Sequence, residues 1–219
     1  MKTAANKILV IDVGGTNLKI RATGGRPIKV PSGPKMTAAQ MVAAAKEVSA
    51  GWQFDAVSIG YPGPVKNNQP MLEPHNLGGG WVKYNFKKAF GCPVKIINDA
   101  AMQALGSHAG GRTLFLGLGT GLGSALVIDG NVLPLELAHL PYKKDRTYEE
   151  YLGNEGLHEH GKKKWREHVA DVVQLLKAAL LADRVVLGGG NARLVKTFPP
   201  GVEAGKNTNA FIGGQRLWK

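Results

Sequence analysis

The chain has 219 residues, of which 43% are hydrophobic and 20% charged. This composition is typical of a globular protein. It excludes full disorder and a bilayer span, because apolar stretches such as 8–13 and 178–182 are far shorter than about 20 residues. A net charge of +12 favours polyanionic ligands such as nucleotides or polyphosphate, although a merely basic surface would explain the charge equally well.

Cysteine and glycine usage narrow the class further. Cys92 is the single cysteine, which excludes an internal disulfide and a cysteine-based zinc site. Residues 1–7 lack the apolar stretch of a secretory signal, so we expect a reducing, cytoplasmic setting. The 30 glycines are about twice the usual share of roughly 7%. They gather at the ends of predicted strands, which indicates ligand-binding loops built from backbone.

Hydrophobic patterns in the first half predict alternating strands and helices. Thr37 is the expected N-cap of the first helix. Strands are predicted at 8–13, 18–22, 27–30, 56–60 and 94–97, and helices at 37–49, 81–90 and 99–107.

The second half opens in the same way. Asp129-Gly130 predicts a tight hairpin turn, and 165–181 is the clearest amphipathic helix. Residues 141–164 give no clear prediction. The tail is rich in turns and ends in apolar residues that we expect to dock, namely Phe211, Leu217 and Trp218. The remaining elements are strands at 113–117, 124–128, 131–133 and 184–187, and a short helix at 191–197.

The two halves share one motif: an apolar strand, a glycine loop that contains a threonine, and a second strand. It occurs at 8–19 and again at 114–127, about half a chain apart. This repeat predicts an α/β protein of two similar halves that face each other across a cleft, with a boundary near 109–112.

The first glycine loop is Asp12-Val13-Gly14-Gly15-Thr16-Asn17-Leu18-Lys19. Backbone N–H groups in such a turn form an anion-binding concavity, because glycine lets phosphate oxygens approach closely. A strand follows rather than a helix, which argues against a P-loop and a dinucleotide fingerprint. Asp12 stands at the mouth of the strand, where it could hold a hydrated Mg²⁺. The alternative is a plain type I′ hairpin with a structural aspartate.

Two further glycine clusters lie in the second half. Gly117–Gly123 has glycine at alternate positions, and each interior glycine destabilises a strand by about 0.5–1 kcal/mol relative to alanine. A closely approaching ligand explains this pattern, and a flexible bend is the alternative. Gly188–Gly190 follows a strand and suits a nucleotide base or ribose, or is simply a tight turn.

Polar residues that could carry chemistry follow two of the strands. Asn98-Asp99 come at a carboxyl strand end, where ligands of α/β proteins bind. Asp99 could take a proton from an attacking hydroxyl, and it could also cap the following helix. Glu136 and His139 form either a clamp for sugar hydroxyls or an ordinary surface pair. The other histidines are expected at the surface: His75, His108, His158, His160 and His168.

Taken in order, these motifs resemble the ROK family of sugar kinases in the actin-like ATPase superfamily, above all its short polyphosphate- or ATP-dependent glucokinases. The resemblance covers nearly the whole chain. It is carried by Asp12…Lys19, Gly60-x-Pro62-Gly63, Asn76-Leu77-x-Gly79, Asn98-Asp99-Ala100, Gly117–Gly123, Glu136-x-x-His139 and Gly188–Gly190.

The resemblance implies an α/β, actin-like (ribonuclease H-like) two-domain fold with an interdomain cleft. A small N-terminal domain would span 1–109 and a larger C-terminal domain 110–219. The implied reaction is phosphoryl transfer from ATP or inorganic polyphosphate to the 6-hydroxyl of a hexose, with glucose as the first candidate. Mg²⁺ would be the metal, held through water by Asp12, and no structural zinc is expected.

The resemblance also implies roles for individual residues. Asp99 matches the catalytic base. The positions that match sugar-binding residues are Gly63, Asn76, Asn98, Glu136 and His139. Those that match phosphate- or nucleotide-binding residues are Asp12, Gly14, Gly15, Thr16, Lys19, Gly119, Thr120, Gly121, Gly188 and Gly189.

The departure from the family pattern that bears on the sugar site is at residue 138, and one alternative function stays open. Ala138 stands where the family has glycine, in Glu136-Leu137-Ala138-His139, which affects the fit of the sugar there. The alternative function is a catalytically inactive sugar- or nucleotide-binding paralogue. The expected partners are a hexose and a phosphoryl donor, with no nucleic acid and no membrane. The oligomeric state stays open, a homodimer included.

Overall fold

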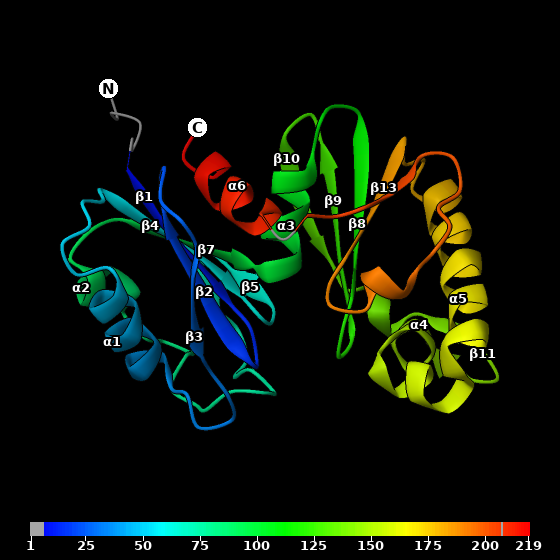
Figure 1. Cartoon of the computed structure of the whole chain (residues 1–219), viewed down its shortest axis with the longest axis horizontal. Helices are drawn as coiled ribbons and strands as arrows, with labels where there is room; N and C mark the ends of the chain where they lie inside the picture. Colours follow the sequence, from blue (N-terminus) through cyan, green and yellow to red (C-terminus); the bar gives the residue numbers. More distant parts are fainter. Residues whose placement is uncertain (1–6, 207) are drawn as a thin grey trace. The chain divides into compact units, whose positions relative to one another are not determined.

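The computed structural model describes residues 7–206 and 208–219, and these form two compact units (Figure 1). Unit 1 comprises the described residues up to Met102 together with Ala210–Lys219, and unit 2 comprises Gln103–Asn209. The predicted division at residue 109 therefore differs from the structure, because the boundary lies inside helix α3 (Asp99–Ser107) and the C-terminal segment returns to unit 1. In the described ranges, no helix is long and apolar enough to cross a bilayer.

Unit 1 is built on a five-stranded sheet of order β3-β2-β1-β4-β7. The pairs β1·β4 and β4·β7 are parallel, so these three strands end at one edge of the sheet. Ligand-binding residues of α/β folds gather at such an edge. The strands are β1 (Ile8–Val13), β2 (Asn17–Ala22), β3 (Ile28–Pro31), β4 (Ala56–Tyr61) and β7 (Val94–Asn98), with a separate small hairpin of β5 (Val65–Lys66) and β6 (Gln69–Pro70).

The helices of unit 1 confirm one local prediction and correct another. Helix α1 (Ala38–Val48) begins after Thr37, whose side chain accepts the N–H of Gln40 in a capping box. The helix predicted over 81–90 is restricted to α2 (Phe86–Phe90). Lys83 has a φ of 66°, in the left-handed region, and this interrupts a continuous helix.

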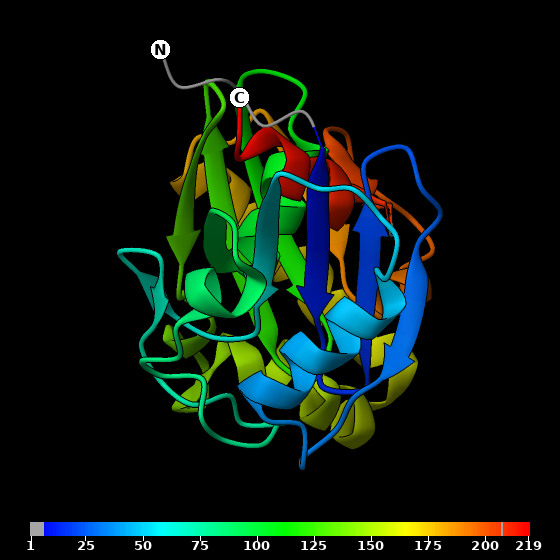
Figure 2. The ribbon, with the colours of Figure 1, turned by 90° about the vertical axis from the view of Figure 1, so that its left-hand side faces the viewer.

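Strand β1 is buried along its whole length because both faces of the sheet are covered. Leu9 and Ile11 belong to the core shared with α1 and α2, and Figure 2 shows α1 crossing that face. Ile8 and Val10 point to the other face, where they pack with Phe211 of α6 (Asn209–Arg216). This alternation is the period of two expected of a strand.

The C-terminal segment docks on unit 1 through polar contacts as well. Ser58 Oγ is buried in β4 and donates to the carbonyl of Gly214 at 2.6 Å. Trp218 Nε1 in turn donates to Ser58 Oγ at 2.8 Å. The predicted docking of Phe211 and Trp218 is therefore confirmed, and it takes place on the sheet of unit 1.

Unit 2 has its own five-stranded sheet, of order β10-β9-β8-β13-β14. The helix predicted over 191–197 is only a short 3₁₀ turn at Ala192–Leu194. The unassigned stretch 141–164 holds a small hairpin, a helix and the start of α5. The elements are β8 (Arg112–Leu118), β9 (Leu122–Ile128), β10 (Asn131–Leu135), β11 (Pro141–Lys143), β12 (Arg146–Thr147), α4 (Tyr148–Leu152), α5 (Asn154–Ala179), β13 (Arg184–Gly188) and β14 (Val202–Ala204).

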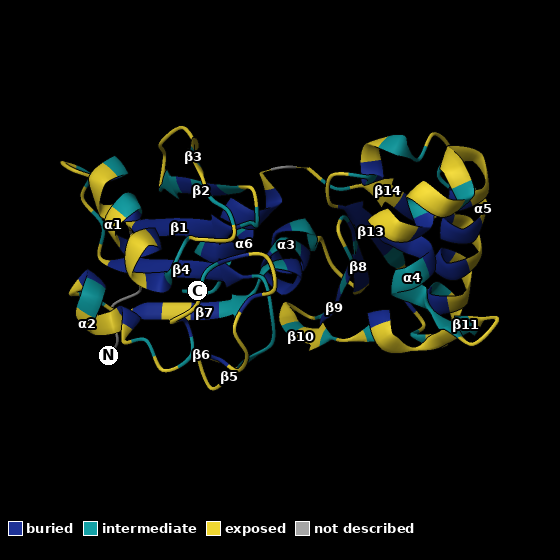
Figure 3. Ribbon diagram, turned by 90° about the horizontal axis from the view of Figure 1, so that it is seen from below, coloured by how far each residue is buried: buried dark blue, intermediate teal, exposed yellow. Residues whose placement is uncertain are grey.

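The core of unit 2 lies between its sheet and one face of α5, whose other face is exposed (Figure 3). Trp165 is fully buried there, and its Nε1 donates to Leu152 O at 3.0 Å. His168 is buried, and His160 and His108 are partly buried, so the surface placement predicted for these three histidines is wrong. The imidazoles of His160 and His168 pack against the ring of Tyr151, and burial lowers the pKa of His168.

The return of α6 to unit 1 predicts a stability effect that can be measured. Phe211 is 2% exposed, so replacing it with alanine leaves a cavity between α6 and the sheet. We expect Phe211→Ala to lower the free energy of unfolding by about 3–5 kcal/mol, measured by urea denaturation. Ile212→Ala, at a half-buried neighbour on the same helix, is the matched control and should lower it less. Equal effects of the two variants would contradict the docking.

Candidate active site

The carboxyl edge of the unit 1 sheet holds Asn98 and Asp99, at the junction of β7 and α3. Asn98 caps the helix, because its Oδ1 accepts the N–H of Ala101 at 3.1 Å. Its Nδ2 donates to Gly63 O at 3.2 Å, which ties the loop after β4 to this junction. Asn98 rather than Asp99 therefore carries out the capping that the sequence left open. Asp99 Oδ1 accepts the N–H of the adjacent Ala100 at 2.8 Å.

An ion pair lies beside Asp99. Lys19 Nζ lies 2.8 Å from Asp12 Oδ2, and the Asp12 side chain is only 6% exposed. The pKa of Asp99 is raised to about 7, first by burial of the carboxyl group and second by the negative charge of Asp12. The N–H of Ala100 and the charge of Lys19 partly offset this rise. A carboxyl group with such a pKa can accept a proton at neutral pH.

The first glycine loop is shaped by close contacts. Gly14 N–H donates to Asn17 O at 3.2 Å, and a Cβ on Gly14 would lie 2.9 Å from the same oxygen. Neither Gly14 nor Gly15 has a positive φ, so the type I′ turn weighed from the sequence does not occur. Ser32 holds the loop from the side, since its Oγ donates to Gly14 O and its N–H donates to Thr16 O.

The same loop touches the loop that carries Asn76. A Cβ on Gly15 would lie 3.0 Å from Asn76 Cβ. Unit 1 thus places Asp12, Lys19 and Asp99 together, and it sets the glycine loop next to Asn76.

Unit 2 brings together the two glycine segments that were predicted to bind phosphate or nucleotide, 117–123 and 188–190. Gly119 N–H donates to Gly121 O at 3.1 Å within the second glycine loop. Asn191 N–H donates to Leu118 O at 2.9 Å, so the turn after β13 lies on this loop. Gly189 has a φ of 81°, and a Cβ there would collide with Leu118 O. Glycine is required at that position by both the backbone conformation and the close approach.

Glu149 of α4 is a residue at this loop that the sequence reasoning missed. Its Oε2 accepts the N–H of Leu122 at 3.1 Å, and a Cβ on Gly121 would collide with that oxygen. Glu149 lies in the stretch without a clear prediction. The signal that could have located the helix is Thr147 with Glu150 three residues later, which form a capping box.

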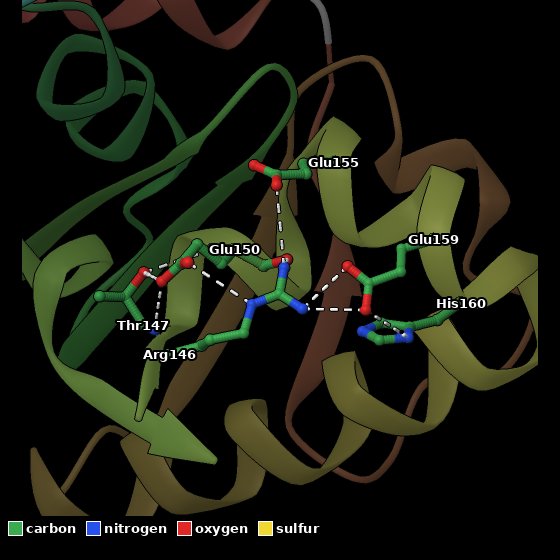
Figure 4. A network of polar contacts seen from close by, with 6 residues as sticks. All are labelled: Arg146, Thr147, Glu150, Glu155, Glu159 and His160. Atoms are coloured by element: carbon green, nitrogen blue, oxygen red, sulfur yellow. Dashed lines mark hydrogen bonds and ion pairs between the residues drawn. The ribbon is translucent and has the colours of Figure 1, made fainter. Parts of the chain in front are cut away.

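A network centred on Arg146 anchors the start of α4 to α5 (Figure 4). Arg146 Nη1 donates to both carboxylate oxygens of Glu159, at 2.9 and 2.8 Å. The same guanidinium lies 3.5 Å from Glu150 and 3.9 Å from Glu155. These contacts fix the helix from which Glu149 reaches the glycine loop.

Glu136 and His139 lie on a 3₁₀ turn of unit 2 (Leu137–His139) and its N-cap. His139 Nε2 is 3.9 Å from Glu136 Oε2, and both side chains are more than 60% exposed. Ala138 between them is buried in the core of unit 2. The two polar residues are thus adjacent and accessible to a ligand, while the residue in the place of the family's glycine serves packing.

The carboxylate oxygens near Asp12 are ligands of the kind that a hard cation such as Mg²⁺ prefers. Across the residues that the structure describes, no three or more His, Cys, Asp or Glu side chains gather in a metal-binding group. Asp12 and Asp99 offer carboxylate oxygens, and Mg²⁺ takes one or two carboxylates while keeping several waters. Lys19 donates to Asp12 Oδ2, so a cation at Asp12 would meet a side chain that already has a positively charged partner.

Comparison with known proteins adds an independent line of evidence. The chain is 26% identical to a polyphosphate glucokinase of Mycobacterium tuberculosis (strain CDC 1551 / Oshkosh), over 93% of this chain and 88% of that protein. It is 31% identical to a glucokinase of Pyrobaculum calidifontis, over 58% of this chain and 45% of that protein.

Solved structures agree in fold. An inorganic polyphosphate/ATP-glucomannokinase from Arthrobacter sp. strain KM matches with a TM-score of 0.75 and 20% identity, covering 95% of this chain and 96% of that one. A ROK family glucokinase from Streptomyces griseus, in complex with glucose and AMPPNP, matches with a TM-score of 0.72 and 18% identity, covering 97% and 99%. These likenesses confirm the predicted actin-like α/β fold. Residues 8–134 match the profile of the ROK family, and the chain is therefore a member of that family.

Proposed function

We propose that this protein is a sugar kinase of the hexokinase and glucokinase type. It transfers a phosphoryl group from ATP or inorganic polyphosphate to the 6-hydroxyl of a hexose, with glucose as the first candidate. The observation that carries the proposal is Asp99, a carboxylate with a pKa of about 7 beside the Asp12–Lys19 pair, at the carboxyl ends of the parallel strands β1, β4 and β7. The relatives named as glucokinases and polyphosphate glucokinases support it.

The proposed step is an in-line displacement. The 6-oxygen of the sugar forms a bond to the terminal phosphorus of the donor, while the bond from that phosphorus to the bridging oxygen breaks. The hydroxyl proton passes to Asp99. Such reactions depend on positioning and charge stabilisation more than on covalent chemistry by the protein. A bound Mg²⁺ would neutralise charge on the phosphates, held through water by Asp12.

The remaining predicted residues take supporting roles in this proposal. Amides of the Gly14-Gly15-Thr16 turn and of Gly119-Thr120-Gly121 bind phosphate oxygens, with Lys19 supplying positive charge. Gly188 and Gly189 support the nucleoside when ATP is the donor. The sugar hydroxyls are bound by Gly63, Asn76, Asn98, Glu136 and His139.

The role of Asp99 predicts a loss of turnover without a loss of sugar binding. Asp99→Asn keeps the shape and the Oδ1 acceptor but cannot take a proton at neutral pH. We expect kcat to fall by about 10²- to 10⁴-fold. Sugar affinity, measured by calorimetry, should stay within a few-fold of the wild type. Asp129→Asn is the matched control, since this aspartate is exposed in a turn with a φ of 50° that asparagine adopts readily. A kcat for Asp99→Asn near the wild-type value would reject the role.

The raised pKa of Asp99 also predicts a pH-dependent stability. Its folded-state pKa of about 7 lies above the ordinary 3.8, so the folded state binds more protons than the unfolded state between these values. The contribution of Asp99 to stability is therefore lost progressively as the pH rises from 3.8 to about 7. We expect Asp99→Asn to melt at a higher temperature than the wild type at pH 8, with a difference that shrinks toward pH 4. A difference independent of pH would contradict the burial of this charge.

The choice of donor and sugar is tested by one coupled assay. A panel of hexoses is supplied with either ATP or polyphosphate, and formation of sugar 6-phosphate is measured. The net charge of +12 favours polyphosphate as one of the donors. Activity with ATP alone would remove the polyphosphate proposal. Binding of sugar or nucleotide without any turnover would instead identify an inactive binding paralogue.

A further inference from the structure

The loop that carries Asn76 is closed by a carboxylate. Glu73 Oε2 accepts the N–H of Trp81 at 3.0 Å, and Glu73 Oε1 accepts the N–H of Val82 at 3.1 Å. Each oxygen of one side chain thus binds one of two successive amides. Residues 73–82, here called the Asn76 loop, are drawn together at their two ends. Hydrogen bonds to a charged acceptor are stronger than those between neutral groups.

The two ends of this loop are also attached to the sheet of unit 1. The hydroxyl of Tyr61, in β4, donates to Leu72 O at 2.6 Å. The rings of Tyr61 and Trp81 lie 5.5 Å apart, and both side chains are fully buried. The base of the loop is therefore packed in the core of unit 1.

The middle of the loop is held differently. Gly78 N–H donates to Met36 O at 3.0 Å, and Trp81 Nε1 donates to Gly78 O at 2.7 Å. A Cβ on Gly78 would lie 2.8 Å from Lys35 O, so the backbones of Gly78 and Lys35 leave no room for a side chain at residue 78. Gly80 has a φ of 82°, which turns the chain toward the two amides that Glu73 binds.

Asn76 is exposed at the tip of this arrangement and touches Gly15 of the first glycine loop. Its place relative to that loop depends on how the Asn76 loop is closed. Glu73 and Asn76 are only three residues apart, and Glu73 supplies the contacts that join the beginning of the loop to its end.

From these contacts we propose that Glu73 is a positioning residue for substrate recognition. It acts through the Asn76 loop, holding Asn76 beside Gly15 so that the amide is ready for a sugar hydroxyl. The inference rests on the proposed function, since Asn76 is there a sugar-binding residue. The Glu73 side chain is exposed, so it does not contribute to core packing. It acts through its two hydrogen bonds to the backbone of Trp81 and Val82.

The test is Glu73→Gln, which keeps the size of the side chain. Glutamine has one acceptor oxygen, and its amide nitrogen would face an N–H donor, so one of the two hydrogen bonds is lost. We expect the KM for the sugar to rise about three- to tenfold, with kcat and the KM for the donor within twofold of the wild type. The melting temperature should be nearly unchanged. Glu47→Gln removes the same charge from an exposed site on α1 and is the matched control.

A double-mutant cycle separates positioning from a general structural effect. In an Asn76→Ala background, Glu73→Gln should no longer raise the KM for the sugar, because the group that it positions is gone. Hydrogen exchange of the Trp81 and Val82 amides should be faster in Glu73→Gln than in the wild type, without any substrate present.

Three results would overturn the inference. One is an unchanged sugar KM in Glu73→Gln, and a second is an equal rise in KM with and without Asn76. The third is a large fall in melting temperature together with a fall in kcat and a rise in both KM values. A wild-type chain that phosphorylates no hexose would reject the proposed function, and the role of Glu73 with it. An active wild type that fails any of these three tests rejects the role of Glu73 alone.

Discussion

The candidate site depends on a balance of charge around one half-buried carboxylate. Burial and the negative charge of Asp12 raise the pKa of Asp99. The N–H of Ala100 and the positive charge of Lys19 lower it again in part. If Lys19 did not pair with Asp12, the negative charge beside Asp99 would be uncompensated. The site therefore holds a carboxyl group whose pKa is close to neutral pH, which suits the proton transfer that we propose for it.

Close approach of backbone is the second constraint, and it recurs in both units. Gly14 and Gly15 lie against Asn17 and Asn76, and Gly189 lies against Leu118. At Gly14 and Gly15 the φ values are ordinary, so the glycines serve contact rather than conformation. Loops packed in this way are held in one shape before a ligand arrives, which reduces the entropy lost on binding.

The loops of unit 2 are held by polar and aromatic side chains. No disulfide contributes, because the single cysteine of the sequence, Cys92, lies in unit 1. The guanidinium of Arg146 joins three glutamates across α4 and α5, and the ring of Tyr151 packs against two histidines. Arg146 is suited to this task because its planar group offers several N–H donors in fixed directions. The network supports α4, and through Glu149 it supports the glycine loop of the same unit.

What the sequence by itself determined is the local structure and the chemistry-bearing motifs. Strand β1 matches its predicted bounds, α3 matches 99–107, and Thr37 caps α1, because hydrophobic period and capping are properties of neighbouring residues. The glycine loops and Asn98-Asp99 were found in the same way.

The tertiary structure alone decided the rest. The docking of α6 depends on Ser58 and Gly214, which are 156 positions apart, and the burial of His168 depends on rings from other elements. Glu149 meets Leu122 from 27 positions away. Such contacts arise from how the elements pack against one another, and the spacing of residues along the chain carries no record of them.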